Sequence, residues 1–411
     1  MAMETDHERA LRLAVEAGHI LLENGAEISR VEETMQRVSA HYGVEDQSFF
    51  VLSNGIIATG RHYASAKFIP IQGTQLLKVV EINQLSRDVS SARSFPLDEL
   101  ERRLGIIRSA PGKPWWELIL AVALGVSAFS ILFGGSLFDA LATFCCGLLL
   151  GGFMAFIGGR LSHIFKNLLG GFLGGLLCIL AVSVGLGDHL PNMIIGTIIA
   201  LVPGVPFTNG IRDLANEDYL AGATRLLDAF LGFLCIALGV VLALLLQGWV
   251  TGAFPELGTA TVDPVAAAWP YQLLAAFVGT VAFSILFGSP VRYYIDCGIT
   301  GMLGWAMYLL MIRYGGFSVA GAAFIAALLV GLTGSVQAMT RRCPVTLFLI
   351  GGIIPLVPGG GIFWTAYYLV AEQLSMAATT GFVALKVTIA IAGGIIVAAA
   401  VSKRFLRAIR K

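Results

Sequence analysis

The feature that most constrains the fold is an internal repeat. The segment AFSILFG occurs at 128–134 and again at 282–288, an offset of 154 residues. The segment LVPG occurs at 201–204 and again at 356–359, an offset of 155 residues. Two matches at almost the same spacing indicate duplication of a unit of roughly 150 residues. Both copies lie in strongly apolar sequence, so we predict that the duplicated unit crosses a membrane.

The charged residues divide the chain into two parts. They make up 13% of the sequence, whereas soluble domains have about 25%. Residues 1–114 carry charges at an ordinary density, and 115–402 carry very few. The change falls at RSAPGKPWW, 108–116, whose tryptophans suit a membrane interface. We therefore expect a small soluble domain followed by a polytopic α-helical membrane domain.

Ten segments are long and apolar enough to span a bilayer as helices. They lie at about 116–136, 139–159, 168–187, 192–210, 226–247, 271–289, 294–312, 317–338, 345–370 and 380–401. The first five match the second five at the repeat offset. Because five is odd, the second copy enters the membrane upside down, which predicts a 5+5 inverted repeat. The expected parts are the soluble domain 1–114, repeat one 115–248, an outer loop 249–270, repeat two 271–402 and a basic tail 403–411.

The distribution of basic residues predicts the orientation. With the soluble domain in the cytoplasm, sixteen lysines and arginines lie in inner loops and flanks, and one lies outside, Arg313. The long outer loop contains Glu256 and Asp263 but no lysine or arginine. Both termini are then cytoplasmic. No signal peptide is visible, because the chain opens with the charged METDHERALR. A net charge of +1 gives no reason to expect nucleic-acid binding.

Spans four and nine are interrupted near their middles by prolines and glycines. Such residues open a helix, and the freed backbone groups must face protein or a wet cavity, since lipid cannot satisfy them. Two broken helices at matching positions of inverted repeats are typical of a transport site, although paired structural kinks are an alternative. The predicted substrate-binding residues are Pro203, Gly204, Pro206, Thr208, Asn209, Asp213, Pro355, Pro358, Gly359 and Gly360.

Ionisable residues are scarce in the apolar spans and are functional candidates there. The candidates for coupling to a proton are Asp213, Asp228, Asp296 and Lys386. Alternatively, Asp228 and Asp296 lie at the cytoplasmic interface and the Lys386 side chain reaches outward to the membrane surface. In that case these residues would not couple transport to a proton.

The soluble domain is predicted to be α+β. A helix over 7–24 ends at Gly25, and Ser29 with Glu32 predicts a capping box for a second helix that ends at Gly43. FFVLSNGIIATG, 49–60, predicts a hairpin that turns at Asn54 and Gly55. A further strand is expected near 66–71, the segment 78–89 suits either a helix or a strand, and a helix is expected over 96–107.

Sequence patterns indicate neither a cofactor nor a metal. The chain has no phosphate-binding loop, no dinucleotide fingerprint and no zinc spacing, which argues against an ATP-driven pump. The six cysteines are expected to pack as small hydrophobic side chains. An enzyme is not expected, although a hydrolase site hidden in the soluble domain stays open as an alternative.

Several long segments resemble the threonine/serine exporter family. They are ALRLAVEAGHILLENGAEISRVEETMQRVSAHYG at 10–43, VVEINQLSRDV at 79–89, LVPGVPFTNGIRDLANEDYLAGATRLLDA at 201–229 and GGIIPLVPGG at 351–360. The last resembles a partner component that some bacteria encode separately. The family's motif positions correspond to Pro203, Gly204, Pro206, Asn209, Asp213, Asp218, Gly222 and Arg225.

The resemblance implies a multi-pass protein of a bacterial inner membrane that exports threonine and serine, driven by the membrane potential or a proton gradient. Relatives made as two chains are linked to dicarboxylates such as succinate, so a dicarboxylate is the alternative substrate. A passive channel is a further alternative, and a homo-oligomer is possible.

Overall fold

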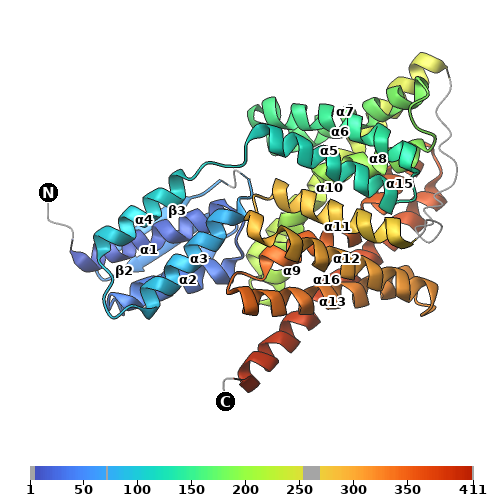
Figure 1. Cartoon of the computed structure of the whole chain (residues 1–411). Helices are drawn as coiled ribbons and strands as arrows, with labels where there is room; N and C mark the ends of the chain where they lie inside the picture. The colour runs from blue at the N-terminus through green and yellow to red at the C-terminus, as the bar shows by residue number, and fades with distance from the viewer. Residues whose placement is uncertain (1–4, 71–72, 253–268, 410–411) are drawn as a thin grey trace.

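The computed structural model describes residues 5–70, 73–252 and 269–409 (Figure 1). Most of the predicted outer loop, with Glu256 and Asp263, lies outside the described residues, as does the end of the basic tail. The rest is mostly helical, as expected for a polytopic membrane protein.

Residues 6–109, which we name the N-terminal unit, contain four helices and a three-stranded antiparallel sheet. The helices are α1 (Asp6–Glu23), α2 (Ile28–His41), α3 (Leu76–Ser91) and α4 (Leu97–Ser109), and the strands are β1 (Ser48–Leu52), β2 (Gly55–Gly60) and β3 (Tyr63–Phe68), in the order β1-β2-β3. The first helix ends next to Gly25 in a left-handed conformation (φ 83°), as predicted. The ambiguous segment 78–89 is helical, because it lies within α3.

The predicted hairpin is confirmed, but its turn lies one residue earlier. Leu52 pairs with Gly55, so the two-residue loop is Ser53 and Asn54. The third strand ends at Phe68, and the backbone N–H of Ile69 then donates to the Asn54 carbonyl at 2.8 Å. This bond fixes where the third strand leaves the sheet.

The predicted capping box of the second helix is wrong. Helix α2 begins at Ile28 with Glu27 as its N-cap, and no side chain within the helix caps it. The N–H of Ile28 instead donates to Oδ1 of Asp213, 3.1 Å away on another helix. Ser29 lies inside the first turn, where its hydroxyl accepts from Nδ2 of Asn216 at 3.2 Å. The cap of α2 therefore comes from the membrane domain.

Eight helices are long and apolar enough to cross a membrane in the described part of the chain. They are α5 (Trp115–Leu132), α6 (Leu137–Phe156), α7 (His163–Ser183), α10 (Tyr219–Thr251), α11 (Trp269–Leu286), α12 (Tyr294–Arg313), α13 (Val319–Arg341) and α16 (Leu374–Ile409). In Figure 1 the N-terminal unit lies at the same end of this bundle as the C-terminal end of α16.

Two further spans are each made of two shorter helices. The first joins α8 (Leu190–Ile198) and the turn η2 (Ile199–Leu201) to α9 (Gly204–Ala215) with a bend of 63°. The second joins α14 (Thr346–Ile353) and the turn η4 (Ile354–Leu356) to α15 (Gly359–Val370) with a bend of 43°. Counting each bent pair as one span gives up to ten candidate spans within the described residues.

The two copies of AFSILFG pack against each other, because they lie on the neighbouring helices α5 and α11. The rings of Phe129 and Phe283 meet edge to face, with centroids 5.3 Å apart. A Cβ at Gly279 would lie 2.8 Å from the Phe129 ring, and one at Gly125 would lie 3.3 Å from the Phe283 ring. Each phenylalanine therefore fits over the glycine one turn before its counterpart, a reciprocal contact typical of two-fold related surfaces.

Candidate functional site

Both helix breaks have the same backbone geometry. Pro203 has φ −76° and ψ 60°, and Pro358 has φ −77° and ψ 50°. The N–H of Gly204 donates to the Val202 carbonyl at 2.8 Å, and the N–H of Gly359 donates to the Val357 carbonyl at 2.7 Å. Each break is thus a three-residue inverse γ-turn centred on proline, whose ring fixes φ near the required value.

The two breaks lie against each other in the bundle. A Cβ at Gly204 would lie 3.5 Å from Cγ1 of Ile354, and one at Gly359 would lie 3.3 Å from Cδ1 of Ile199. Helix α9 packs on α14, and α8 packs on α15. Each break therefore faces the turn that precedes the other break.

We name the place where the two breaks pack against each other the crossing. It brings the predicted break residues together. Pro203, Gly204, Pro355, Gly359 and Gly360 are buried. Pro206 and Pro358 are partly buried, and Thr208 is buried one turn further along α9. Helices α9 and α15 each begin at one of the two breaks, so two helix N-termini, each with a partial positive charge, lie at the crossing. This arrangement suits a carboxylate.

Asn209 and Asp213 lie further down α9, and their side chains contact the N-terminal unit. Nδ2 of Asn209 donates to the Gly25 carbonyl at 2.6 Å. Oδ2 of Asp213 lies 2.5 Å from Nη1 of Arg225, and both side chains are almost fully buried. Nη2 of Arg225 donates to the Ala26 carbonyl at 2.9 Å. Asn209 of the broken helix and Arg225 of α10 therefore both bind the loop between α1 and α2.

A second ion pair, between Glu27 and Arg212, joins the N-terminal unit to α9. Oε2 of Glu27 lies 2.6 Å from Nη1 of Arg212, and Oε1 of Glu27 lies 3.1 Å from Nη2 of Arg30. Burial raises the pKa of Glu27, but Arg212 and Arg30 outweigh it, so the pKa lies below its ordinary value. We did not single out Glu27 or Arg212 from the sequence, although both lie in the segments that resemble the family.

The other coupling candidates do not gather at the breaks. Asp296 pairs with Arg341, with Oδ2 and Nε 3.1 Å apart. Asp228 is half exposed on α10, with Oδ1 4.0 Å from Nδ1 of His163. Lys386 is exposed on α16, where its ammonium lies 4.5 Å from the centre of the Phe382 ring.

Sequence reasoning missed a buried carboxylate at the opposite end of the bundle. Asp139 is fully buried at the start of α6 and caps it in a box with Ser136. Oδ1 of Asp139 accepts from the N–H of Asp188 at 2.7 Å, and Oδ2 lies 2.8 Å from Nδ1 of His189. The spacing of Ser136 and Asp139 is that of a capping box and is the signal that could have revealed it.

Comparisons with known proteins identify the family. The model of the family described as putative threonine/serine exporter matches residues 12–247, and that described as threonine/serine exporter, ThrE, matches 272–401. The threonine/serine exporter of Corynebacterium glutamicum is 26% identical, over 98% of this chain and 85% of the relative. The probable threonine/serine exporter of Mycobacterium tuberculosis is 23% identical, over 86% of this chain and 69% of the relative.

A relative of another description matches a smaller share of the chain. The probable succinate transporter subunit YjjP of Escherichia coli is 27% identical, over 60% of this chain and its own full length. No solved structure matches. Since the two family models together cover the N-terminal unit and both halves of the membrane domain, the chain belongs to the threonine/serine exporter family.

Proposed function

We propose that the chain exports threonine and serine as a secondary transporter, with its substrate site where the two helix breaks cross. The observation that carries this proposal is the meeting of two matched breaks, each with a proline-centred turn and each followed by a helix N-terminus. The two helix N-termini at the breaks suit the carboxylate of an amino acid, and carbonyls freed by the turns suit its ammonium group. The names of the relatives support the substrate class.

The mechanism that we propose is alternating access of two inverted five-helix repeats, residues 115–248 and 271–402. The reciprocal contact of Phe129 and Phe283 and the equal geometry of the breaks support a two-fold relation between the repeats. Rocking of one repeat against the other would open the crossing to each side in turn.

We place the N-terminal unit and the C-terminus in the cytoplasm of a bacterium, with the membrane domain in the inner membrane. The excess of sixteen basic residues over one supports this orientation. A bond from Nζ of Lys403 to Oδ1 of Asn216, 2.9 Å long, joins α16 to the loop after α9, so these segments lie on one side. In this orientation Asp139 and His189 lie on the outer side.

Proton coupling is part of the proposal, and the candidates remain Asp213, Asp228, Asp296 and Lys386. Asp213 lies on a broken helix and Asp296 is held by Arg341. A movement of either helix would therefore change the surroundings of a carboxylate. The second candidate substrate is a dicarboxylate such as succinate, and the name of the Escherichia coli relative is the observation that favours it.

Counterflow in proteoliposomes tests the proposed function. Vesicles loaded with unlabelled threonine should accumulate labelled threonine, and succinate-loaded vesicles should show which substrate is preferred. Gly359→Val should reduce counterflow at least about tenfold, since the added side chain meets Ile199 at the crossing. Gly152→Val is the matched control, because a Cβ there has no neighbour within 4 Å. Absence of counterflow with threonine, serine and dicarboxylates would refute export by this chain.

A further inference from the structure

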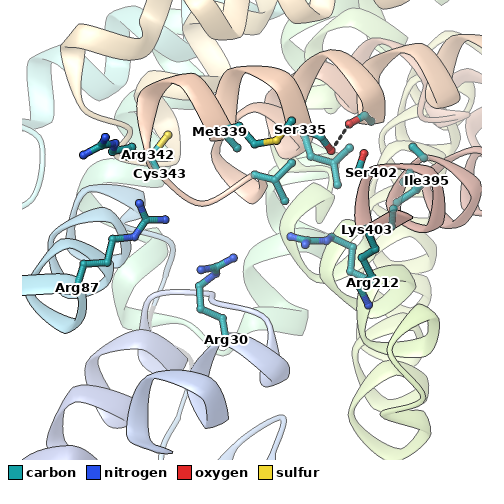
Figure 2. A pocket seen from close by; sticks show the side chains of 16 residues that line it. Arg30, Arg87, Arg212, Ser335, Met339, Arg342, Cys343, Ile395, Ser402 and Lys403 are labelled. Atoms are coloured by element: carbon teal, nitrogen blue, oxygen red, sulfur yellow. Dashed lines mark hydrogen bonds between the residues drawn. The ribbon is translucent and has the colours of Figure 1, made fainter. Parts of the chain in front are cut away.

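A cavity of about 370 Å³ separates the N-terminal unit from α13 and α16 (Figure 2). Five of the side chains around it are basic: Arg30 of α2, Arg87 of α3, Arg212 of α9, Arg342 just after α13, and Lys403 of α16. Figure 2 shows the guanidinium groups of Arg30, Arg87 and Arg212 extending into the space below α13. The cavity therefore lies between the N-terminal unit and helices from both halves of the membrane domain.

The positive charge in this cavity is not balanced by the protein. Glu27 pairs with both Arg30 and Arg212, so one carboxylate serves two guanidinium groups. Within the ranges that the structure covers, neither Arg87 nor Arg342 has an acidic partner. Burial, together with the nearby Arg30, Arg37 and Arg342, lowers the pKa of Arg87. Like charges brought together in this way need a counterion.

The orientation of the membrane helices explains only three of the five basic residues around the cavity. Arg212, Arg342 and Lys403 follow the rule that basic residues flank spans on the cytoplasmic side. Arg30 and Arg87 belong to the N-terminal unit, which lies outside the spans, and both point toward the membrane domain. Side chains from separate stretches of the chain thus converge on one space, as in a binding site.

The rest of the lining limits the ligand. The walls from α13, α14 and α16 are largely apolar and include Leu349, Ile395 and Ala398. Ser335 and Ser402 also line the cavity. The volume is at the small end of the range for ligand pockets, about 300–1,000 Å³. These walls fit a compact anion rather than a polymer or a large nucleotide.

We propose that this cavity binds a small soluble anion that carries two or more negative charges and bridges the N-terminal unit to α13 and α16. The guanidinium groups form charge-assisted hydrogen bonds with its oxygen atoms. The bound anion neutralises the repulsion among the arginines and holds the N-terminal unit in its docked position. The site is separate from the crossing of the helix breaks and does not depend on which substrate is exported.

The test uses the full-length purified protein, with inorganic pyrophosphate as the probe. Calorimetric titration should show binding that weakens steeply as the salt concentration rises, and pyrophosphate should raise the unfolding midpoint. Arg87→Gln should weaken binding about tenfold or more, whereas Arg87→Lys should retain most of it. Without pyrophosphate, the Gln variant should unfold at the same temperature as the unmodified protein or higher, since a repulsive charge has been removed.

Arg61→Gln is the matched control, because Arg61 is an exposed arginine of the same unit and is absent from the cavity. This variant should bind pyrophosphate as the unmodified protein does. Equal binding by Arg87→Gln, or no binding of pyrophosphate at low salt, would overturn the proposal. A parallel measurement in nanodiscs with and without phosphatidylglycerol identifies the source of the anion. Stabilisation by the anionic lipid alone would also overturn the assignment of a soluble ligand.

Discussion

Among single residues, Asp213 connects the most parts of the molecule. Its two oxygens bind the N–H of Ile28 and the guanidinium of Arg225. Arg225 in turn holds the Ala26 carbonyl. A buried charge that loses its partner is costly, since water no longer compensates it. We therefore assign a large part of the cohesion between the N-terminal unit and the broken helix to this pair.

Removing one member of the pair should destabilise the protein more than removing both. Asp213→Asn should cost about 3–5 kcal/mol, because it leaves Arg225 buried without a counter-charge. Adding Arg225→Met should recover a large part of that loss. The measurement is a double-mutant cycle on unfolding midpoints of the purified protein. Strictly additive losses would show that the two side chains do not depend on each other.

Glu27 should make docking sensitive to acid. Its pKa lies below the ordinary value of 4.5, so the contact with Arg212 and Arg30 stabilises the folded state above that pH. The contribution is lost as the pH falls through the lowered pKa. The midpoint difference between the unmodified protein and Glu27→Gln should be constant from about pH 7 to about pH 5 and shrink near pH 4. A difference that vanishes already near pH 6 would contradict this assignment.

At the scale of elements, the two breaks differ from ordinary proline kinks. At each break, the N–H of the glycine after the proline donates a hydrogen bond to the carbonyl of the valine before the proline. A new helix starts at that glycine. The bends of 63° and 43° follow from these turns. Because the breaks pack on each other, straightening one displaces the other.

Replacing a proline at a break should therefore affect transport more than stability. Pro358→Ala restores a backbone N–H and permits the helix to continue, at a site where the neighbouring glycines still tolerate the turn. We expect roughly a tenfold loss in the initial rate of threonine counterflow, with the unfolding midpoint little changed. Pro114→Ala, at the start of α5 and away from the breaks, is the control. An unaltered rate in Pro358→Ala would indicate that the break has only a structural role.

At the scale of the whole molecule, the sequence predicts the spans well and the contacts between distant segments poorly. Proline and glycine clusters located both breaks, because they act through local backbone geometry. The hydrogen bonds of Asn209 and Asp213 to the N-terminal unit could not be predicted, because their partners Gly25 and Ile28 lie more than 180 residues away in the sequence. The capping box at Ser29 failed for the same reason, because Asp213 supplies the cap from the membrane domain. Composition alone cannot reveal such long-range pairs.

In the transport cycle that we propose, the substrate occupies the crossing of the two breaks. The most direct test of this position is protection of a cysteine at Ile199 or Ile354, each introduced into a protein that lacks its six native cysteines. Threonine should slow alkylation of both positions in a saturable way, and it should not affect a cysteine at Val184, which is exposed at the end of α7. Alkylation at Ile199 and Ile354 that is indifferent to threonine, serine and succinate, in protein that still transports them, would contradict the account.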